Sequence, residues 1–170
     1  MIIESPIGNI RVFCEDDHVV EVLLPGWNEK IQPSIKNPST KYEKQVANAF
    51  NEYFKSASKN EVAKKWKELV KVSIGNKYFP KSSEFQSKVY KALTSKVPSS
   101  HTVAYGELAA LAGSPLAARA AGNAMKKNPL PIIVPCHRVL PSTGELGNYM
   151  GSEGSGQKTK KWLLEHEGAI

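Results

Sequence analysis

The chain has 170 residues, of which 41% are hydrophobic and 23% are charged. These proportions are ordinary for a soluble globular protein, and the length can bury a core in one domain or two small ones. No apolar run approaches the roughly 18 residues of a membrane span, and the N-terminus lacks the features of a secretory signal. The two cysteines, Cys14 and Cys136, fall in different predicted domains, which argues against a disulfide framework and favours a reducing, intracellular compartment.

The net charge of +7 comes mainly from the second half of the chain, where 11 basic residues and 6 acidic residues follow Pro80. Such an excess favours a polyanionic partner. Nucleic acid is favoured over a membrane because the sequence shows no basic amphipathic helix with aromatic anchors. A lysine-rich surface that is merely solvated is the alternative interpretation.

Residues 7–13 and 19–24 alternate in hydrophobicity and predict a β-hairpin that turns at residues 15–17. After a polar loop, Thr40 and Glu43 have the spacing of a helix capping box. The helix that follows is predicted to bury residues at steps of three and four, namely Tyr42, Val46, Ala49, Phe50 and Tyr53.

Residues 56–77 are rich in lysine, and we predict a surface segment there with one short strand near residues 69–74. No chemical site is evident before this point. Residues 1–80 are therefore predicted to form a small α/β supporting domain with an antiparallel sheet.

A second, mostly helical domain is predicted for residues 81–170. Ser83 and Gln86 form another capping box, and the helix they begin has a stripe of apolar residues, Phe85, Val89, Ala92 and Leu93. Residues 97–100 then break this helix. The fold class expected for the whole chain is therefore α+β.

Two further helices are predicted over residues 106–112 and 115–127. Gly113 ends the first of them, Ser114 caps the second, and Pro115 lies in its first turn. Two helices joined by a short turn that contains glycine are typical of a helix-turn-helix.

The second of these helices carries Arg119, Lys126 and Lys127 and no acidic residue. It is also rich in alanine and glycine, which allow another surface to approach closely. That surface is either a neighbouring helix in the core or the groove of a DNA duplex.

Residues 132–134 are three β-branched residues between two prolines and predict a short buried strand. Pro135 has no backbone N–H to donate to a sheet, so the strand is predicted to end there, with Cys136 directly after its end. His137 and Arg138 follow directly, and a cysteine in such a basic setting is a candidate nucleophile. A small buried residue without chemistry is the alternative. A turn-rich loop follows, and a final helix over residues 157–167 is predicted to pack over this strand.

The run Pro135–Val139 resembles the active-site run of the O6-alkylguanine-DNA alkyltransferases. The resemblance is dense from about Phe85 to the C-terminus and thin before it, where it depends on Ser5–Gly8 and Asn51–Phe54. Further segments resemble the family in the family's order, namely Tyr105–Ala109, Ala118–Ala120, Asn128–Pro131, Gly147–Tyr149 and Leu163–Glu167.

The resemblance implies that the cysteine thiolate attacks the alkyl carbon on O6 of guanine, and O4-alkylthymine is an expected second substrate. The cysteine would keep the alkyl group, so each molecule would act once. The expected partner is double-stranded DNA containing O6-alkylguanine. The protein is expected to act as a monomer, to bind in the minor groove and to extrude the damaged base from the helix. No cofactor is implied, and the expected location is the nucleus of a eukaryote or otherwise the cytoplasm.

The resemblance also implies the catalytic roles. Cys136 is the alkyl acceptor, and His137 removes its proton through a bridging water. The glutamate that orients this histidine matches Glu167 rather than Glu165. Asn128 matches a hinge asparagine between the basic helix and the active-site run.

On the DNA side, Tyr105 matches a tyrosine that contacts the guanine, and Arg119 matches an arginine that fills the gap in the base stack. The remaining expected contacts are Tyr149, Gln86, Gly106, Ser114, Ser142, Val139 and Met150. Met150 replaces a small polar residue of the family, so a bulkier pocket wall would alter the tolerance for large alkyl groups. The loop near residues 152–157 is longer than the family's.

Some members of this family hold a structural zinc ion in the N-terminal domain. Here only Cys14 and His18 are candidate ligands, which is too few for a tetrahedral site, so no metal is expected.

Three other classes of function compete with alkyl transfer. The first is a non-catalytic protein that flags damaged DNA, but such relatives lack the cysteine. The second is a helix-turn-helix regulator with an inert cysteine, for which the Pro135–Val139 run would have no purpose. The third is a thiol hydrolase. The sequence gives no sign of a pocket for an acyl group, which argues against this class.

Overall fold

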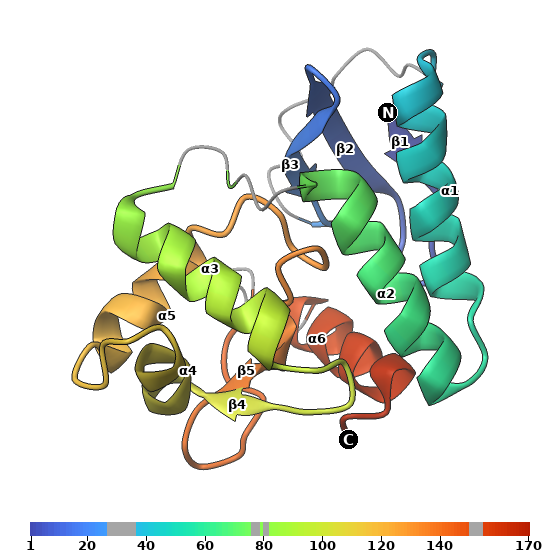
Figure 1. Cartoon of the computed structure of the whole chain (residues 1–170). Helices are drawn as coiled ribbons and strands as arrows, with labels where there is room; N and C mark the ends of the chain where they lie inside the picture. Colours follow the sequence, from blue (N-terminus) through green and yellow to red (C-terminus); the bar gives the residue numbers. More distant parts are fainter. Residues whose placement is uncertain (27–36, 76–78, 80–81, 150–154) are drawn as a thin grey trace.

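The computed structural model describes residues 1–26, 37–75, 79, 82–149 and 155–170 (Figure 1). Over these residues it has six α-helices, a three-stranded antiparallel sheet and a two-stranded parallel sheet. The predicted α+β class is therefore confirmed. None of the helices described is long and apolar enough to cross a membrane.

The predicted N-terminal hairpin is present as β2 (Ile10–Glu15) and β3 (His18–Leu23). It turns at Asp16 and Asp17, whose φ angles of 44° and 57° are in the left-handed region that aspartate tolerates better than most residues. A short strand that the sequence did not predict, β1 (Ile2–Ile3), pairs with β2 and completes the order β1-β2-β3.

Helix α1 (Lys41–Lys55) begins with the predicted capping box. Helix α2 (Lys59–Ile74) occupies the segment for which we predicted a surface segment with one short strand near residues 69–74, so the predicted strand is wrong. Val62, Trp66 and Leu69 recur at helical spacing and are buried on its inner face, which outweighs the lysine-rich composition. The two helices pack side by side over the sheet (Figure 1).

In the second half, α3 (Glu84–Lys96) also begins with its predicted capping box. Helices α4 (Tyr105–Leu111) and α5 (Ala118–Lys126) follow and pack on each other. Gly113 ends the first with a φ of 86°, as expected for this position.

The predicted start of the second helix of this pair is wrong. Residues 115–117 form a turn, and α5 begins three residues later from Ala117 without a side-chain cap. Ser114 accepts a hydrogen bond from the backbone of Ala117 through its own carbonyl, so it closes a turn rather than capping a helix. Leu116, in this turn, is fully exposed.

Residues 132–134 are fully buried as predicted, but they form a turn rather than a strand. Ile132 has a φ of 74°, a conformation that no extended strand contains. Cys136–Arg138 form a short 3-10 helix, η1, which leads into β5 (Val139–Leu140). This strand pairs in parallel with β4 (Val103–Ala104).

The last helix, α6 (Ser155–Glu167), lies against both α2 and η1 (Figure 1). It therefore packs over the cysteine-bearing segment as predicted, although that segment is a 3-10 turn. The buried residues of both halves form one hydrophobic cluster, and the backbone of Val22 in β3 donates to Pro129 O at 2.8 Å. The cysteine-bearing turn thus sits where the two halves meet.

Candidate active site

Cys136 opens η1 and is only 8% exposed. Asn128 fixes the preceding turn, because its side chain donates to Val134 O at 2.8 Å and accepts from Leu130 N at 3.0 Å. The thiol sulfur lies 3.5 Å from the hydroxyl of Tyr149. The turn, the asparagine and the tyrosine together hold the sulfur in one place.

The environment of Cys136 acts on its pKa in both directions. Burial raises the pKa, while the Tyr149 hydroxyl, the Asn128 side chain and the charge of Lys160 lower it, and the net result is a raised value. The resting thiol is therefore protonated near neutral pH, so reaction requires a base.

His137 is fully buried beside the cysteine. Its Nε2 lies 3.1 Å from Oε1 of Glu167, although the alignment falls short of a hydrogen bond. Nδ1 has no hydrogen-bond partner among the residues that the structure describes. Burial, together with the charges of Arg138 and Lys160, lowers the pKa of His137 more than Glu167 raises it, so the imidazole is neutral at pH 7.

Glu167 is held by a fully buried network. The guanidinium of Arg138 binds it through two hydrogen bonds, from Nε to Oε2 at 2.7 Å and from Nη2 to Oε1 at 2.9 Å. Tyr53 donates to Oε1 at 2.9 Å. Burial would raise the pKa of Glu167, but His137 and Arg138 outweigh it and lower the pKa to about 2. The carboxylate therefore remains charged.

Arg138 has further partners that compensate for its own burial. Nη1 donates to Val97 O at 2.9 Å, and the guanidinium lies 3.8 Å from the ring centroid of Trp66. The indole of Trp66 in turn donates to Ile132 O at 3.0 Å. The network thus links α2 to the turn that precedes the cysteine.

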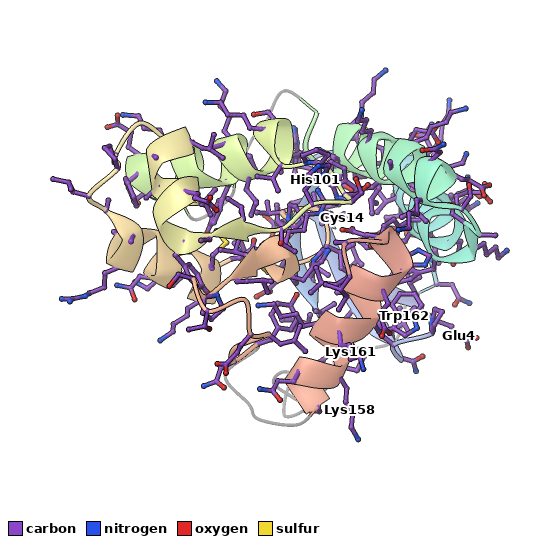
Figure 2. The ribbon with its side chains drawn as sticks, turned by 90° about the horizontal axis from the view of Figure 1, so that it is seen from below. Glu4, Cys14, His101, Lys158, Lys161 and Trp162 are labelled. Atoms are coloured by element: carbon purple, nitrogen blue, oxygen red, sulfur yellow. The ribbon has the colours of Figure 1, made fainter. Side chains whose placement is uncertain are left out.

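Lys160 is the other buried cation of the site. It is 1% exposed and donates to Val139 O at 2.8 Å, with Nζ lying 5.8 Å from the ring centroid of Tyr149. Lys158 and Lys161, its neighbours on α6, extend outward instead (Figure 2). Burial lowers the pKa of Lys160 to about 8. It therefore carries most of its charge at pH 7, close to the thiol.

The two principal DNA contacts expected from the sequence, Tyr105 and Arg119, lie on α4 and α5. Arg119 is exposed near the start of α5, as are Lys126 and Lys127 at its end. Tyr105 is partly buried, and its ring faces Gly122, where an added Cβ would lie 3.7 Å from a ring carbon. Burial raises the pKa of Tyr105, and the nearby Cys136 raises it further.

The other expected contacts have varied surroundings. The side chain of Gln86 completes the capping box of α3, Gly106 has open space around its Cα, and Ser142 is exposed on the loop after β5. Val139 is buried, and its carbonyl accepts from Lys160. Met150 lies outside the described residues, as do residues 152–154 of the predicted loop, whereas residues 155–157 are the first residues of α6.

Several residues of this buried site were not assigned to it from the sequence. Arg138 was noted only as a basic neighbour of the cysteine, and Lys160, Tyr53 and Trp66 were assigned no role in the site. The helical spacing of Trp66 within 59–74 was a usable signal for a buried indole. Helical spacing predicted that Tyr53 is buried, but no local signal identified the partners of Tyr53, Arg138 and Lys160, because those partners are distant in sequence.

Cys14 does not belong to this site. It is half-buried on β2, where burial and then the charge of Glu43 raise its pKa to about 11. Over the described residues, no three cysteine, histidine or acidic side chains gather in a way that could hold a metal ion.

The chain is similar in sequence to known O6-methylguanine DNA methyltransferases. Residues 84–169 match the family model of the 6-O-methylguanine DNA methyltransferase DNA-binding domain. A methylated-DNA–protein-cysteine methyltransferase of Methanosarcina acetivorans is 36% identical over 168 residues, which cover 99% of this chain and 97% of the relative. The corresponding protein of Cricetulus griseus is 52% identical over 84 residues. That match covers 49% of this chain and only 39% of the relative.

Solved structures are similar over nearly the whole chain. The O6-methylguanine methyltransferase of Mycobacterium tuberculosis is 30% identical, with a TM-score of 0.72 over 99% of this chain and 91% of that one. A structure of the Mycobacterium tuberculosis OGT in complex with DNA has a TM-score of 0.71, 28% identity and the same coverage of both chains. The match to the Methanosarcina acetivorans protein extends over both halves of the chain. The chain therefore belongs to the O6-methylguanine DNA methyltransferase family.

Proposed function

We propose that this protein repairs DNA by direct reversal, taking the alkyl group from O6-alkylguanine onto the sulfur of Cys136. The observation that carries this proposal is the buried thiol beside a histidine whose Nε2 faces a charged carboxylate. The family's full-length relatives, named methylated-DNA–protein-cysteine methyltransferases, support it. A thioether has no easy leaving route, so each molecule acts once.

The proton path follows from the network around Glu167. A carboxylate facing Nε2 favours the tautomer with the proton on that nitrogen, which leaves the lone pair on Nδ1 as the base. Adjacent residues direct their side chains apart, so Nδ1 takes the thiol proton through a water molecule. The thiolate attacks the alkyl carbon, the C–O6 bond breaks, and guanine leaves with the electron pair and regains one proton.

Lys160 and Tyr149 stabilise the thiolate while it forms. The ammonium charge of Lys160 and the hydroxyl of Tyr149 both lower the pKa of the thiol, against the effect of burial. Asn128 adds a further hydrogen bond and holds the turn as a hinge. This electrostatic support matters because a buried thiolate without partners is strongly disfavoured.

Duplex DNA is the partner, contacted through α4 and α5 used as a helix-turn-helix. Arg119 fills the gap left when the damaged nucleotide is extruded, and Tyr105 contacts the guanine. Insertion from the minor groove suits a protein that must inspect every sequence, because that groove carries a degenerate pattern of donors and acceptors. Weaker contacts come from Gln86, Gly106, Ser114 and Ser142, while Tyr149 and Val139 wall the base pocket.

The same pocket takes O4-alkylthymine as a second substrate. The protein acts as a monomer on nuclear DNA in a eukaryote, or on cytoplasmic DNA otherwise. Residues 1–80 form a supporting domain, and residues 81–170 form the domain that carries alkyl transfer.

The experiment that tests this function uses a duplex carrying O6-[³H]methylguanine. We expect one labelled methyl group per protein molecule, bound covalently and accompanied by restored guanine. A protein that binds the duplex without gaining label would be a damage-flagging protein or a regulator. A protein that gains no label but hydrolyses a thioester substrate repeatedly would be a hydrolase.

Replacing Arg119 with alanine should slow repair in duplex DNA far more than reaction with the free base O6-benzylguanine. The free base needs no extrusion, so it does not need the side chain that fills the stack. We expect a loss of roughly 10-fold or more on duplex, corresponding to about 1.4 kcal/mol or more of extrusion energy, and almost none on the free base.

The control for this variant is Lys126→Ala, which removes a positive charge from the other end of α5. It should weaken duplex binding in a salt-dependent way with a smaller change in the repair rate of bound DNA. Equal losses on duplex and free base for Arg119→Ala would assign the arginine to the fold or the pocket.

Methylation of Cys136 should lower the melting temperature of the protein. The sulfur is buried and 3.5 Å from the Tyr149 hydroxyl, so an added methyl group must displace a neighbour. Such overpacking typically costs about 1–3 kcal/mol, and we expect the structure to open near Asn128. Thermal melts of free and stoichiometrically methylated protein, without DNA, measure the effect. An unchanged or higher melting temperature would contradict the coupling of repair to destabilisation.

A further inference from the structure

Tyr53 reaches the active site from α1, outside the segment that matches the family model. Its side chain is fully buried, and its hydroxyl donates to Oε1 of Glu167 at 2.9 Å. We propose that Tyr53 is a positioning residue. By donating to Oε1 of Glu167, it weakens the interaction of this carboxylate with His137 and so keeps the imidazole a neutral base. The inference rests on the proposed function, and it makes the N-terminal half part of the catalytic machinery.

Oε1 of Glu167 is shared by three groups. Tyr53 and Nη2 of Arg138 each donate a hydrogen bond to it at 2.9 Å, while Nε2 of His137 lies 3.1 Å away without hydrogen-bond alignment. A carboxylate oxygen has two lone pairs, and two donors already use them. His137 is therefore left with the weakest of the three contacts.

This sharing controls the charge state of His137. The charged and titratable groups around the imidazole are Glu167 and Lys160 from α6, Arg138 from its own turn, the adjacent Cys136, Tyr149 beside the thiol, and Tyr53 from α1.

Glu167 raises the pKa of the imidazole, whereas burial, Arg138 and Lys160 lower it, and the net value is lowered. Burial and then Glu167 hold the pKa of Tyr53 well above its usual range, so its hydroxyl remains a donor. Without that hydroxyl, the freed lone pair would stabilise the protonated imidazole, and the pKa of His137 would rise.

The test is Tyr53→Phe, with the alkyl-transfer rate measured from about pH 5 to about pH 9 on both duplex and free O6-benzylguanine. Because the neutral imidazole is the base, activity falls as pH drops through its pKa. We expect this acidic midpoint to move upward by roughly 0.5 to 1 pH unit, since the protonated imidazole gains part of a charge-assisted hydrogen bond to Glu167. The rate should fall roughly 3- to 10-fold below the midpoint and less than about 2-fold above it, equally on both substrates.

The matched control is Tyr42→Phe. Tyr42 lies on the same helix, and its hydroxyl donates to the carbonyls of Val72 and Ser73 at 3.0 Å and 3.1 Å, away from the site. Its removal should leave the midpoint unchanged. If Tyr53→Phe also leaves the midpoint unchanged, or lowers the rate equally at every pH, Tyr53 has only a structural role and the inference is overturned.

Two further measurements keep the inference testable. An NMR titration of the His137 ring in ¹⁵N-histidine-labelled protein reports the same rise of its pKa without any activity, so an inactive wild-type protein would overturn the proposed function alone. If Tyr53→Phe does not fold, 3-fluorotyrosine at position 53 supplies a stronger donor of similar shape. It should move the midpoint downward, and an unmoved midpoint would overturn the inference.

Discussion

Replacing Cys136 with serine is expected to abolish alkyl transfer while leaving DNA binding nearly intact. The serine hydroxyl keeps the size of the side chain, but His137 cannot convert it to an anion as it can a thiol. The exposed face of α5 that carries Arg119 is untouched by the change. Mass spectrometry of the protein after incubation with alkylated duplex measures the transfer, and gel-shift titration measures the binding.

Cys14→Ser is the matched control, because it removes the other thiol of the chain. It should retain full transfer, since burial and neighbouring negative charge keep the pKa of Cys14 at about 11. A methyl group found on Cys14, or transfer retained in Cys136→Ser, would overturn the assignment of the acceptor.

Replacing Glu167 with glutamine should have the largest effect on stability. The variant keeps the shape of the side chain but leaves the guanidinium of Arg138, which is fully buried, without its counter-charge. Breaking a buried ion pair in this way typically costs about 3–5 kcal/mol, a large part of the roughly 5–15 kcal/mol by which a domain is stable. Urea unfolding at pH 7 measures the loss, and alkyl transfer should also be slowed.

Glu165→Gln is the control on the same helix. Glu165 is half exposed and pairs with Lys161 at 3.7 Å, so its loss should change stability by less than about 0.5 kcal/mol. Similar losses in the two variants would show that the network around Arg138 does not stabilise the fold.

The pH dependence of stability gives an independent check on Glu167. Its folded pKa of about 2 lies below the ordinary value of 4.5, so its contribution is complete above pH 4.5 and is lost as pH falls toward 2. His137 also makes the protein less stable in acid. Its pKa is lower in the folded state than the ordinary value of 6.5, so below pH 6.5 the unfolded chain binds a proton more readily than the folded one. Glu167→Gln should therefore lose the acid sensitivity that the carboxylate confers.

Local signals in the sequence were sufficient for most helices of this protein. The capping boxes at Thr40 and Ser83 and the glycine stop at Gly113 are contained within a few residues, and the structure has all three. Helix α2 was missed because lysine-rich composition was weighed above the spacing of Val62, Trp66 and Leu69. Periodicity is the better guide there, since burial depends on which face is apolar and not on overall charge.

The site was only partly predictable. The family resemblance brought together Cys136, His137 and Glu167, and the structure places all three within one buried cluster. Tyr53 lies 114 residues from its partner Glu167, so no window of the sequence relates the two. Lys160 is one of three lysines on α6, and only the packing distinguishes it from its exposed neighbours.

The backbone of Ile132 has a consequence for the order in which this protein folds. A β-branched residue with a φ of 74° is disfavoured by roughly 1–3 kcal/mol, so the isolated segment does not adopt this turn by itself. The indole of Trp66 can donate to the carbonyl of Ile132 only after α2 has docked, whereas the side chain of Asn128 donates to Val134 within the same loop. The turn should therefore close late in folding, and a newly made chain should expose its reactive thiol to oxidants until that last step is complete.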